Sequence, residues 1–509
     1  MNSEQTMKKP PYGMIAILFV GAFVAFLNNT LLNVALPTIM KDFGITYSKV
    51  QWLATGYMLV SGILVPASAF FVTRFKNRHL FITAMSIFTI GTIMAGFAPN
   101  FGMLLAGRMV QAAGASSMSP LLMNVMLTSF PKEKRGTAMG IFGLVMIMAP
   151  AIGPTLSGYI VEHHDWRMLF QMIIPFALIS LLFGVWKLRN VMETREVHLD
   201  FLSVLLSTVA FGGILYGFST AGDKGWSSPW VYGTITIGFI ALIIFVVKQL
   251  KMDEPLLELR IYKYPMFALG SVISVIVSMA MFSGMILTPA YVQSIRGIEP
   301  FEAGLMMLPG ALVMGIMSPI TGKLFDKFGP RVLAIIGLTI TTIATFGLTK
   351  LEIDSSYTYI VSMYTIRMFG MSMVMMPIMT NGLNQLPQMM NPHGTAINNT
   401  LQQVSGAIGS AILVTFMNNR TKVKAEELIA EAKANAAQSG AAPTAEQMQQ
   451  MQDQIMQNAL LDGITHSFLI ATGITVIAVV LAFFLKRVKV ESAAASMDLK
   501  KPTKRVPSQ

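Results

Sequence analysis

The stretch LLAGRMVQAAG at residues 104–114 sets one arginine, Arg108, inside an otherwise apolar run. A second stretch, MYTIRMFGMSM at residues 363–373, repeats the Arg-Met pair at Arg367, 259 residues later. An arginine within hydrocarbon costs at least about 2.5 kcal/mol on insertion scales, so it must face protein or a water-filled cavity. We expect backbone carbonyls or Gln111 to accept the hydrogen bonds of Arg108, and we expect Arg367 to brace helix packing.

Two further pairs of segments echo each other at almost the same separation. RGTA at 135–138 matches HGTA at 393–396 with an offset of 258, and RFKNR at 74–78 matches KFGPR at 327–331 with an offset of 253. Three echoes in one order indicate an internal duplication. Duplicated halves in membranes commonly enclose a central site and rock around it, although a duplication kept only for packing is the alternative.

Composition places the chain in a membrane. Of its 509 residues, 53% are hydrophobic and 12% are charged, whereas soluble domains carry about 25% charged residues. Most of the surface must therefore face lipid. The absence of cysteine excludes disulfides and thiolate metal sites. The net charge of +12 is spread over short clusters between apolar runs, which argues against a nucleic-acid partner.

The apolar runs predict an all-α membrane protein, because a helix needs roughly 20 apolar residues to cross the hydrocarbon core. Fourteen runs qualify: 13–36, 50–72, 79–98, 102–127, 136–160, 167–187, 199–219, 230–249, 265–290, 301–322, 330–350, 357–380, 393–417 and 463–486. An even number places both termini on one side. Most Lys and Arg residues fall in loops on that side, so the positive-inside rule assigns both termini to the cytoplasm.

The duplication divides the chain into two six-helix bundles joined by two extra helices. The predicted segments are a cytoplasmic N-terminus (1–12), a first bundle (13–190), a linker of two transmembrane helices (191–255), a second bundle (256–486) and a basic cytoplasmic tail (487–509). Within the second bundle, 418–462 is rich in Ala, Gln, Glu, Met and Lys. That composition predicts exposed helix or partial disorder in a long extracellular loop.

Seven stretches resemble one known family when taken as a set. They are LLNVALPTI (31–39), QWLATGYML (51–59), LLAGRMVQAAG (104–114), APAIGPTLSG (149–158), DWRMLF (165–170), EAGLMMLPGAL (302–312) and GKLFDKFGPR (322–331). Their order and spacing resemble the fourteen-helix drug:proton antiporters of the major facilitator superfamily, of the EmrB/QacA and lincomycin-resistance (LmrB) type. The resemblance implies the fold with two six-helix bundles and two additional helices.

The resemblance also implies roles for several residues in coupling and conformational change. Arg108, with Gln111 nearby, corresponds to an arginine tied to proton coupling. The fifth helix carries the antiporter motif, in which prolines kink the helix and glycines allow close packing; its residues are Pro150, Gly153, Pro154 and Gly158. The loop with Gly322, Asp326 and Arg331 corresponds to a charge latch. Its first-half copy has Thr73 where an aspartate is expected, so a latch there is in doubt.

One departure from the family concerns the proton. Many members carry an acid in the first helix, where this chain has Asn28 and Asn29. No Asp or Glu lies at the middle of any predicted span. Three interpretations remain: the proton binds near an entrance, at a group such as Glu162, Asp165, Glu302 or His393; the protein is an uncoupled facilitator; or the asparagines are an engineered substitution that locks one state.

A substrate cavity is predicted from polar, aromatic and methionine side chains on several spans. Amides offer hydrogen bonds, aromatic rings offer flat apolar faces, and methionine adapts to varied shapes. The candidates are Asn28, Asn29, Asn33, Trp52, Tyr57, Met371, Met375, Asn398 and Gln402. For the methionines, simple core or lipid contact is the competing interpretation.

The leading functional prediction is a multidrug efflux transporter that exports amphipathic small molecules by alternating access, with proton coupling implied by the resemblance. Alternatives are an exporter of an endogenous metabolite or signalling nucleotide, an uncoupled facilitator, and a non-transporting membrane sensor. No Walker sequence supports an ATP-driven pump, and we expect neither enzymatic activity, nor a cofactor, nor a metal, although His163 and His164 are adjacent. The predicted setting is a monomer in the lipid bilayer of a bacterial plasma membrane.

Overall fold

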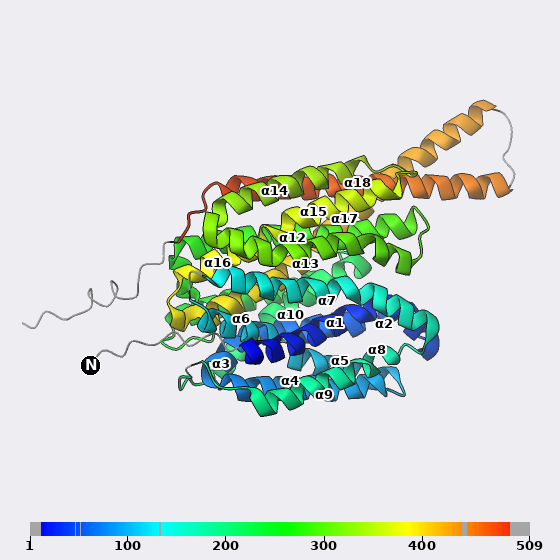
Figure 1. Ribbon diagram of the computed structural model, residues 1–509. Helices are drawn as coiled ribbons and strands as arrows, with labels where there is room; N and C mark the ends of the chain where they lie inside the picture. The colour runs from blue at the N-terminus through cyan, green and yellow to red at the C-terminus, as the bar shows by residue number, and fades with distance from the viewer. Residues whose placement is uncertain are drawn as a thin grey trace, which may run out of the picture.

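The computed structural model describes residues 12–45, 47–50, 52–131, 134–192, 194–439 and 445–488. Within them all regular structure is helical, and the helices of the body run roughly along one common direction (Figure 1). Some side chains within these helices fall outside the description, among them those of Asn33, Pro150 and Pro154.

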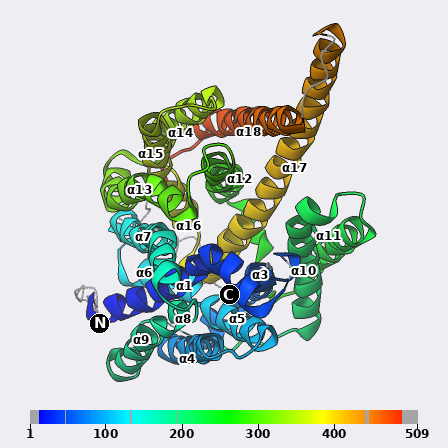
Figure 2. The same ribbon diagram turned by 90° about the vertical axis from the view of Figure 1, so that its right-hand side faces the viewer.

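The described residues of the first part of the chain form nine helices. They are α1 (Tyr12–Phe43), α2 (Tyr47–Val50), α3 (Trp52–Arg74), α4 (Asn77–Gly96), α5 (Phe101–Ala115), α6 (Met118–Ser129), α7 (Arg135–His163), α8 (Met168–Gln171) and α9 (Ile173–Lys187). Next come α10 (Phe201–Lys224) and α11 (Pro229–Lys251), which pack on each other at the edge of the molecule (Figure 2).

The remainder of the chain is likewise helical. It comprises η2 (Leu259–Lys263), α12 (Pro265–Ser294), α13 (Pro300–Phe328), α14 (Pro330–Gly347), η3 (Leu348–Lys350), α15 (Tyr357–Ser372), α16 (Met375–Gln385), η4 (Gln388–Met390), α17 (Asn391–Ser439) and α18 (Ala445–Ala482).

Twelve helical segments of the described chain are long and apolar enough to cross a membrane. Two predicted spans are not among them. The run 102–127 is divided between α5 and α6, and from the run 136–160 only the shorter apolar stretch Arg135–Ala149 of α7 qualifies. The structure therefore shows an all-helical protein with twelve strongly apolar segments, and the number fourteen stays a prediction.

The internal duplication has a structural counterpart in two interrupted helices. α5 ends at Ala115 and α6 begins at Met118, whereas α15 ends at Ser372 and α16 begins at Met375. The two interruptions are 257 residues apart, close to the 259 residues between Arg108 and Arg367. Each half therefore has a break about two turns beyond its buried arginine.

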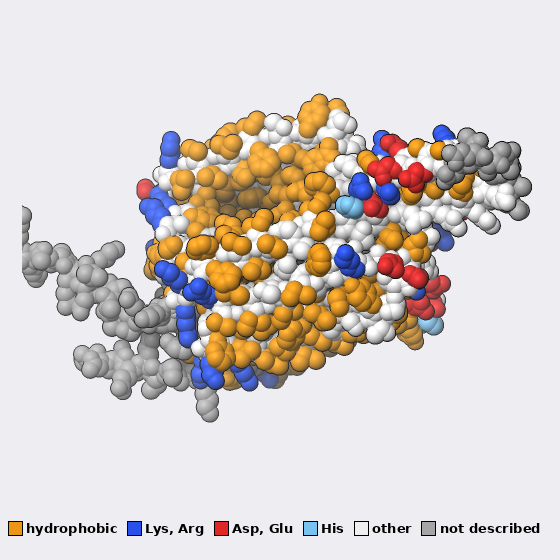
Figure 3. Space-filling view, turned by 90° about the horizontal axis from the view of Figure 1, so that it is seen from above, with side chains coloured by type: hydrophobic (Ala, Val, Ile, Leu, Met, Phe, Trp, Pro, Cys, Tyr) orange, Lys and Arg blue, Asp and Glu red, His pale blue; other side chains and the backbone are white. Residues whose placement is uncertain are grey.

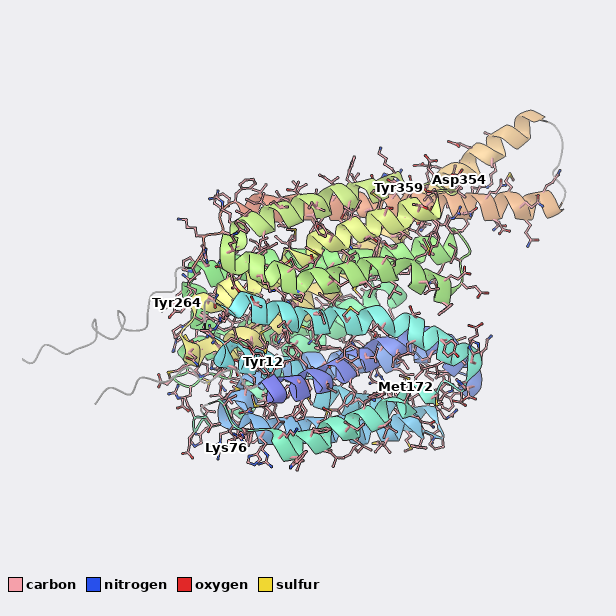
Figure 4. All side chains as sticks on the ribbon, in the orientation of Figure 1. Tyr12, Lys76, Met172, Tyr264, Asp354 and Tyr359 are labelled. Atoms are coloured by element: carbon pink, nitrogen blue, oxygen red, sulfur yellow. The ribbon has the colours of Figure 1, made fainter. Side chains whose placement is uncertain are left out.

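The two ends of the bundle differ in charge. Lys76 and Tyr264 lie at one end, and Met172 and Asp354 lie at the other (Figure 4). The first end, where the described chain begins and finishes, is here called the terminal end; the opposite one is the hairpin end. Lys and Arg gather at the terminal end and Asp and Glu at the hairpin end, with a broad hydrophobic belt between them (Figure 3).

Residues 418–439 and 445–462, predicted as exposed helix or partial disorder, continue α17 and α18 as helix. The two helices project together beyond the hairpin end (Figure 1). An ion pair joins Arg420 Nε to Asp462 Oδ2 at 2.6 Å across the base of this projection. Gln457 Nε2 donates to the Ile295 carbonyl at 2.8 Å, which attaches the projection to the end of α12.

Small residues allow α7 to approach two neighbours. On one side it lies along α13 (Figure 2), where a Cβ on Gly322 would come within 2.2 Å of the Gly136 carbonyl oxygen. On another side it packs on α1, where a Cβ on Gly153 would meet Thr30 Oγ1 at 2.2 Å. Glycine is required at both places because any side chain would force the helices apart.

Candidate functional site

Arg108 is fully buried and tied to three helices. Its Nη1 donates to Gln111 Oε1 at 3.0 Å, which is the partner expected from the sequence, and its Nε donates to the Leu53 carbonyl at 3.5 Å. Gln111 Nε2 in turn donates to Thr92 Oγ1 at 2.9 Å. The guanidinium carbon lies 4.3 Å from the centre of the Tyr57 ring, an arrangement that favours a cation. A positive charge is thereby held within the apolar body of the protein.

Arg367 is its counterpart in the second half. It is also fully buried, and its Nε donates to Thr345 Oγ1 at 3.2 Å while its Nη2 donates to the Ala280 carbonyl. Its side chain fills the place that a Cβ on Gly284 would occupy, 2.0 Å from Nη1. Arg367 thus joins α15 to α12 and α14, which agrees with a bracing role.

Asp326, which the sequence predicts to belong to a charge latch, bridges the two halves at the terminal end. Its carboxylate accepts from Gly136 N at 2.9 Å, from Thr137 N at 2.9 Å and from Thr137 Oγ1 at 2.8 Å. These N–H groups begin α7, where no side chain of the same helix provides a cap. A carboxylate at a helix N-terminus satisfies free donors and interacts favourably with the helix dipole.

Three more hydrogen bonds cross between the halves near the same end. Asn124 Nδ2 donates to Thr395 Oγ1 at 2.8 Å, so α6 is joined to the start of α17. Arg135 Nη1 donates to Asn384 Oδ1 at 3.3 Å, which joins the start of α7 to α16. Ser318 Oγ donates to the Gly140 carbonyl at 2.8 Å between α13 and α7.

Thr73 and Arg331 do not take part in this junction, whereas Gly322 packs against Gly136 there. Thr73, the first-half counterpart of Asp326, donates to the Ala69 carbonyl within its own helix at 2.7 Å. Arg331 is exposed. Thr395 of α17 corresponds to Thr137 of α7 in the duplicated sequence. Thr137 contacts the charged Asp326, whereas Thr395 contacts the uncharged Asn124.

The predicted cavity residues occupy different surroundings. Trp52 lies 5.8 Å from the Tyr216 ring of α10, whereas Tyr57 is buried against Arg108. Met371 is fully buried in the hydrophobic core of the second half, and Asn398 is buried on α17. Met375 and Gln402 line one small cavity, and the structure adds Ser274 and Ser278 of α12 to its wall.

Asn28 has no partner for its amide among the described residues. It is 1% exposed, and neither its Oδ1 nor its Nδ2 forms a hydrogen bond there. Asn29 is half-buried. Gly158 lies near the hairpin end, where a Cβ would meet the Phe301 ring at 2.8 Å. Asn28 therefore differs from Asn124, whose Nδ2 donates two hydrogen bonds.

Sequence reasoning did not find the residues that join the halves other than Asp326. Asn124 and Ser318 lie in apolar runs, Asn384 lies just beyond the run 357–380, and none of the three belongs to a recognisable motif. The repeated RGTA and HGTA sequences were the available signal, because Thr137 and Thr395 each form a hydrogen bond with the opposite half.

The comparisons agree with this architecture. A family model described as Major Facilitator Superfamily matches residues 18–410. The chain is 50% identical to the uncharacterized MFS-type transporter YhcA of Bacillus subtilis, over 82% of this chain and 79% of that protein. It is 45% identical to the lincomycin resistance protein LmrB of Listeria innocua, over 84% of this chain and 91% of that protein.

A third relative and a solved structure extend the likeness over nearly the whole chain. LmrB of Bacillus subtilis is 43% identical over 96% of this chain and 98% of that protein. The crystal structure of the human organic anion transporter MFSD10 (TETRAN) superposes with a TM-score of 0.65 at 12% identity, covering 93% of this chain and 100% of that chain. At that identity the superposition speaks for the fold alone. The chain belongs to the Major Facilitator Superfamily and is a multi-pass membrane transporter of that family.

Proposed function

We propose that this transporter exports amphipathic small molecules by alternating access. The observation that carries the proposal is the set of cross-half hydrogen bonds. The described residues show six of them near the terminal end, between α6, α7, α13, α16 and α17. Breaking these few contacts would let that end open. Relatives named for lincomycin resistance support a drug-like substrate.

The proposed topology has fourteen transmembrane helices with both termini in the cytoplasm of a bacterial cell. Bundles 13–190 and 256–486 move against each other, and the pair α10 and α11 lies beside them. The basic terminal end supports this orientation, because Lys and Arg favour the inner side. The present state is then closed towards the cytoplasm, with α17 and α18 projecting outside.

Proton coupling is the proposed driving force, on the strength of the family resemblance. An uncoupled facilitator is the second candidate, and a specific observation favours it: Asn28 and Asn29 stand in α1 where a proton-carrying acid is expected, and amides do not titrate at physiological pH. In either case Asn29, Met375 and Gln402 are proposed to contact substrate, and Arg108 to respond to it.

A susceptibility and transport experiment tests export. Cells lacking the gene, cells expressing it and cells expressing Arg108→Ala would be compared in a panel of drugs and fluorescent dyes. Export predicts slower efflux and greater susceptibility in the deletion strain for at least one compound, with no rescue by Arg108→Ala. Equal efflux of every compound in all three strains would contradict export and favour a sensor.

A second experiment separates antiport from facilitation. Purified protein in proteoliposomes would be given an active compound from the panel, with and without an imposed pH gradient. Antiport predicts flux that increases with the gradient, whereas a facilitator predicts flux that follows the substrate gradient alone. In the latter case Asn28→Asp and Asn29→Glu would show whether a restored acid confers a response to pH.

A further inference from the structure

His393 occupies a different environment from the other histidines. The chain has six, all within the described residues, and the other five are exposed. His393 is partly buried in the first turn of α17, next to the junction between the halves. It also stands where the first half has Arg135, at the corresponding place in the HGTA and RGTA echo.

The ring of His393 accepts a hydrogen bond from the chain that links α11 to α12. The backbone N–H of Glu258 donates to His393 Nδ1 at 3.2 Å. An imidazole nitrogen accepts only when it carries no proton, so this contact requires neutral His393. The contact fastens the linker segment 256–260 to the start of α17.

The linker segment is in turn fixed to the two extra helices. Gln249 of α11 accepts from Leu257 N at 3.2 Å and donates to Ser203 Oγ of α10 at 2.6 Å. Ser203 Oγ donates a hydrogen bond to the Asp200 carboxylate, which also forms an ion pair with Lys248. A continuous set of contacts therefore runs from α10 and α11 to His393.

The same turn of α17 holds the junction between the halves. Thr395, two residues after His393, accepts from Asn124 of the first half at 2.8 Å. A movement of the α17 N-terminus that detaches Thr395 must also change the His393–Glu258 contact, because both lie on one helical turn. The linker segment 256–260 and the first half of the chain therefore both contact the first turn of α17.

Building on the proposed transport function, we infer that His393 is a positioning residue that clamps the linker to α17 in the state closed at the terminal end. Protonation weakens the clamp, because both ring nitrogens then carry hydrogen and neither can accept the Glu258 N–H, so that only the hydrogen bond to the Leu256 backbone is left. A positive ring at the N-terminus of a helix is also unfavourable. Acidification on the terminal side therefore shifts the protein towards the state that is open there.

The charged groups around His393 do not replace the lost contact. Arg195 lies near the ring and disfavours a second positive charge. Glu258 is turned to Arg260, from which it accepts a backbone hydrogen bond at 3.1 Å and with which it forms an ion pair at 3.6 Å. Arg74 at the end of α3 pairs with Glu196, and Asp200 at the start of α10 pairs with Lys248. The ranges of α6, α12, α16 and η4, which also pack on α17, contain no charged residue.

Hydrogen exchange of the Glu258 amide tests the clamp directly, without any substrate. Peptides covering 254–262 would be followed by mass spectrometry, each rate being divided by that of the unstructured peptide at the same pH. Wild-type protection should fall by roughly tenfold for each pH unit below the pKa of His393. His393→Asn keeps an acceptor near the place of Nδ1 and should show protection independent of pH. His393→Leu should lack the protection at every pH.

Transport provides the second measurement. Wild-type flux should change with the pH on the terminal side, and His393→Asn should abolish that response while keeping flux. His79→Asn and His198→Asn, exposed histidines at the same end, should behave like wild type and serve as controls. Identical pH profiles for wild type and His393→Asn, or protection that ignores pH in wild type, would overturn the inference. Absence of flux for every compound would instead count against the proposed function, and the exchange result would still decide the clamp.

Discussion

Asp326 on α13 caps the first turn of α7 by accepting the backbone N–H of Gly136 at 2.9 Å, although 190 residues separate the two in sequence. Helix α7 has no capping side chain of its own. Because the cap comes from the other half, the N–H groups of Gly136 and Thr137 have this acceptor only while the halves are together. Opening the terminal end exposes these donors, and water must then satisfy them.

Replacement of Asp326 should weaken the closed state. Asp326→Ala removes all three acceptor contacts, and the loss of a cap costs about 0.5–2 kcal/mol. We expect a lower unfolding temperature in detergent and faster labelling of a cysteine introduced at Ser318, a site that the closed junction shields. The chain lacks cysteine, so that label is the only reactive thiol. Arg331→Ala, at an exposed neighbour, is the control and should change neither measurement.

The contact between Gly136 and Gly322 should tolerate no side chain. Gly322→Ala places a methyl group 2.2 Å from the Gly136 carbonyl oxygen, so the helices must separate. Overpacking of this kind typically costs about 1–3 kcal/mol. Gly473→Ala on α18 is the matched control, since a Cβ there meets nothing within 4 Å. A Gly322→Ala protein as stable and active as the control would refute this packing.

The unpartnered amide of Asn28 predicts an unusual response to an apolar substitution. Asn28→Leu removes two buried polar atoms that have no described partner, so the unfolding temperature should stay the same or rise. Asn124→Leu should do the opposite and cost about 1–3 kcal/mol, because it leaves the Pro120 carbonyl and Thr395 without their donor. Thermal unfolding of both variants in one detergent checks the contrast. Equal losses in the two would show that the Asn28 amide is satisfied in solution.

Gln111 should affect both stability and transport through its hydrogen bond to Arg108. Gln111→Leu leaves Arg108 Nη1 without its acceptor, while Thr92 Oγ1 keeps its hydrogen bond to the Phe88 carbonyl. A buried polar group without a partner costs about 1–3 kcal/mol, and a charged one costs more. Gln111→Glu provides an acceptor again and should recover stability, but it neutralises the charge of Arg108. If that charge responds to substrate, flux should remain low in Gln111→Glu despite recovered stability. Flux that follows stability in both variants would mean that the network is only structural.

The Asp200–Lys248 pair should be insensitive to pH in the physiological range. The Lys248 ammonium, which donates to the carboxylate, and the Ser203 hydroxyl lower the pKa of Asp200 below its ordinary value of 3.8. A lowered folded-state pKa adds stability that is present above the ordinary value and is lost as the pH falls through the folded value. The gap in unfolding temperature between wild type and Asp200→Asn should thus stay constant from about pH 5 to 8. If this difference in unfolding temperature disappeared within that pH interval, the lowered pKa of Asp200 would be contradicted.

Much of the helix arrangement could be predicted because lipid imposes one strong rule on composition. Apolar runs predicted most helix starts to within a few residues, but α17 extends to Ser439 instead of 417 and α18 begins at Ala445 instead of 463. The interruption between α5 and α6 could not be read from the sequence, because Ser116 and Ser117 are tolerated within helices. The helical continuation of α17 was only one of two alternatives, since its composition suits both exposed helix and disorder.

The candidate site was less predictable for a physical reason. Arg108 stands out because a buried charge is costly, and its partner Gln111 follows from the spacing of one helical turn. Asn124 and Thr395 meet although they lie 271 residues apart, so no local pattern announces them. Met371 and Met375 illustrate the same limit: both look alike in sequence, but one is core and the other lines a cavity.

The unbroken length of α17 has a mechanical consequence. Its 49 residues form one rod that begins at the cross-half junction and ends outside the body, about 73 Å away at 1.5 Å per residue. A rod of that length works as a lever: a tilt of its inner end swings the outer tip through a larger arc. The outer tip of α17 should therefore move whenever the junction between the halves opens. We expect an antibody fragment that immobilises this tip to inhibit transport from outside.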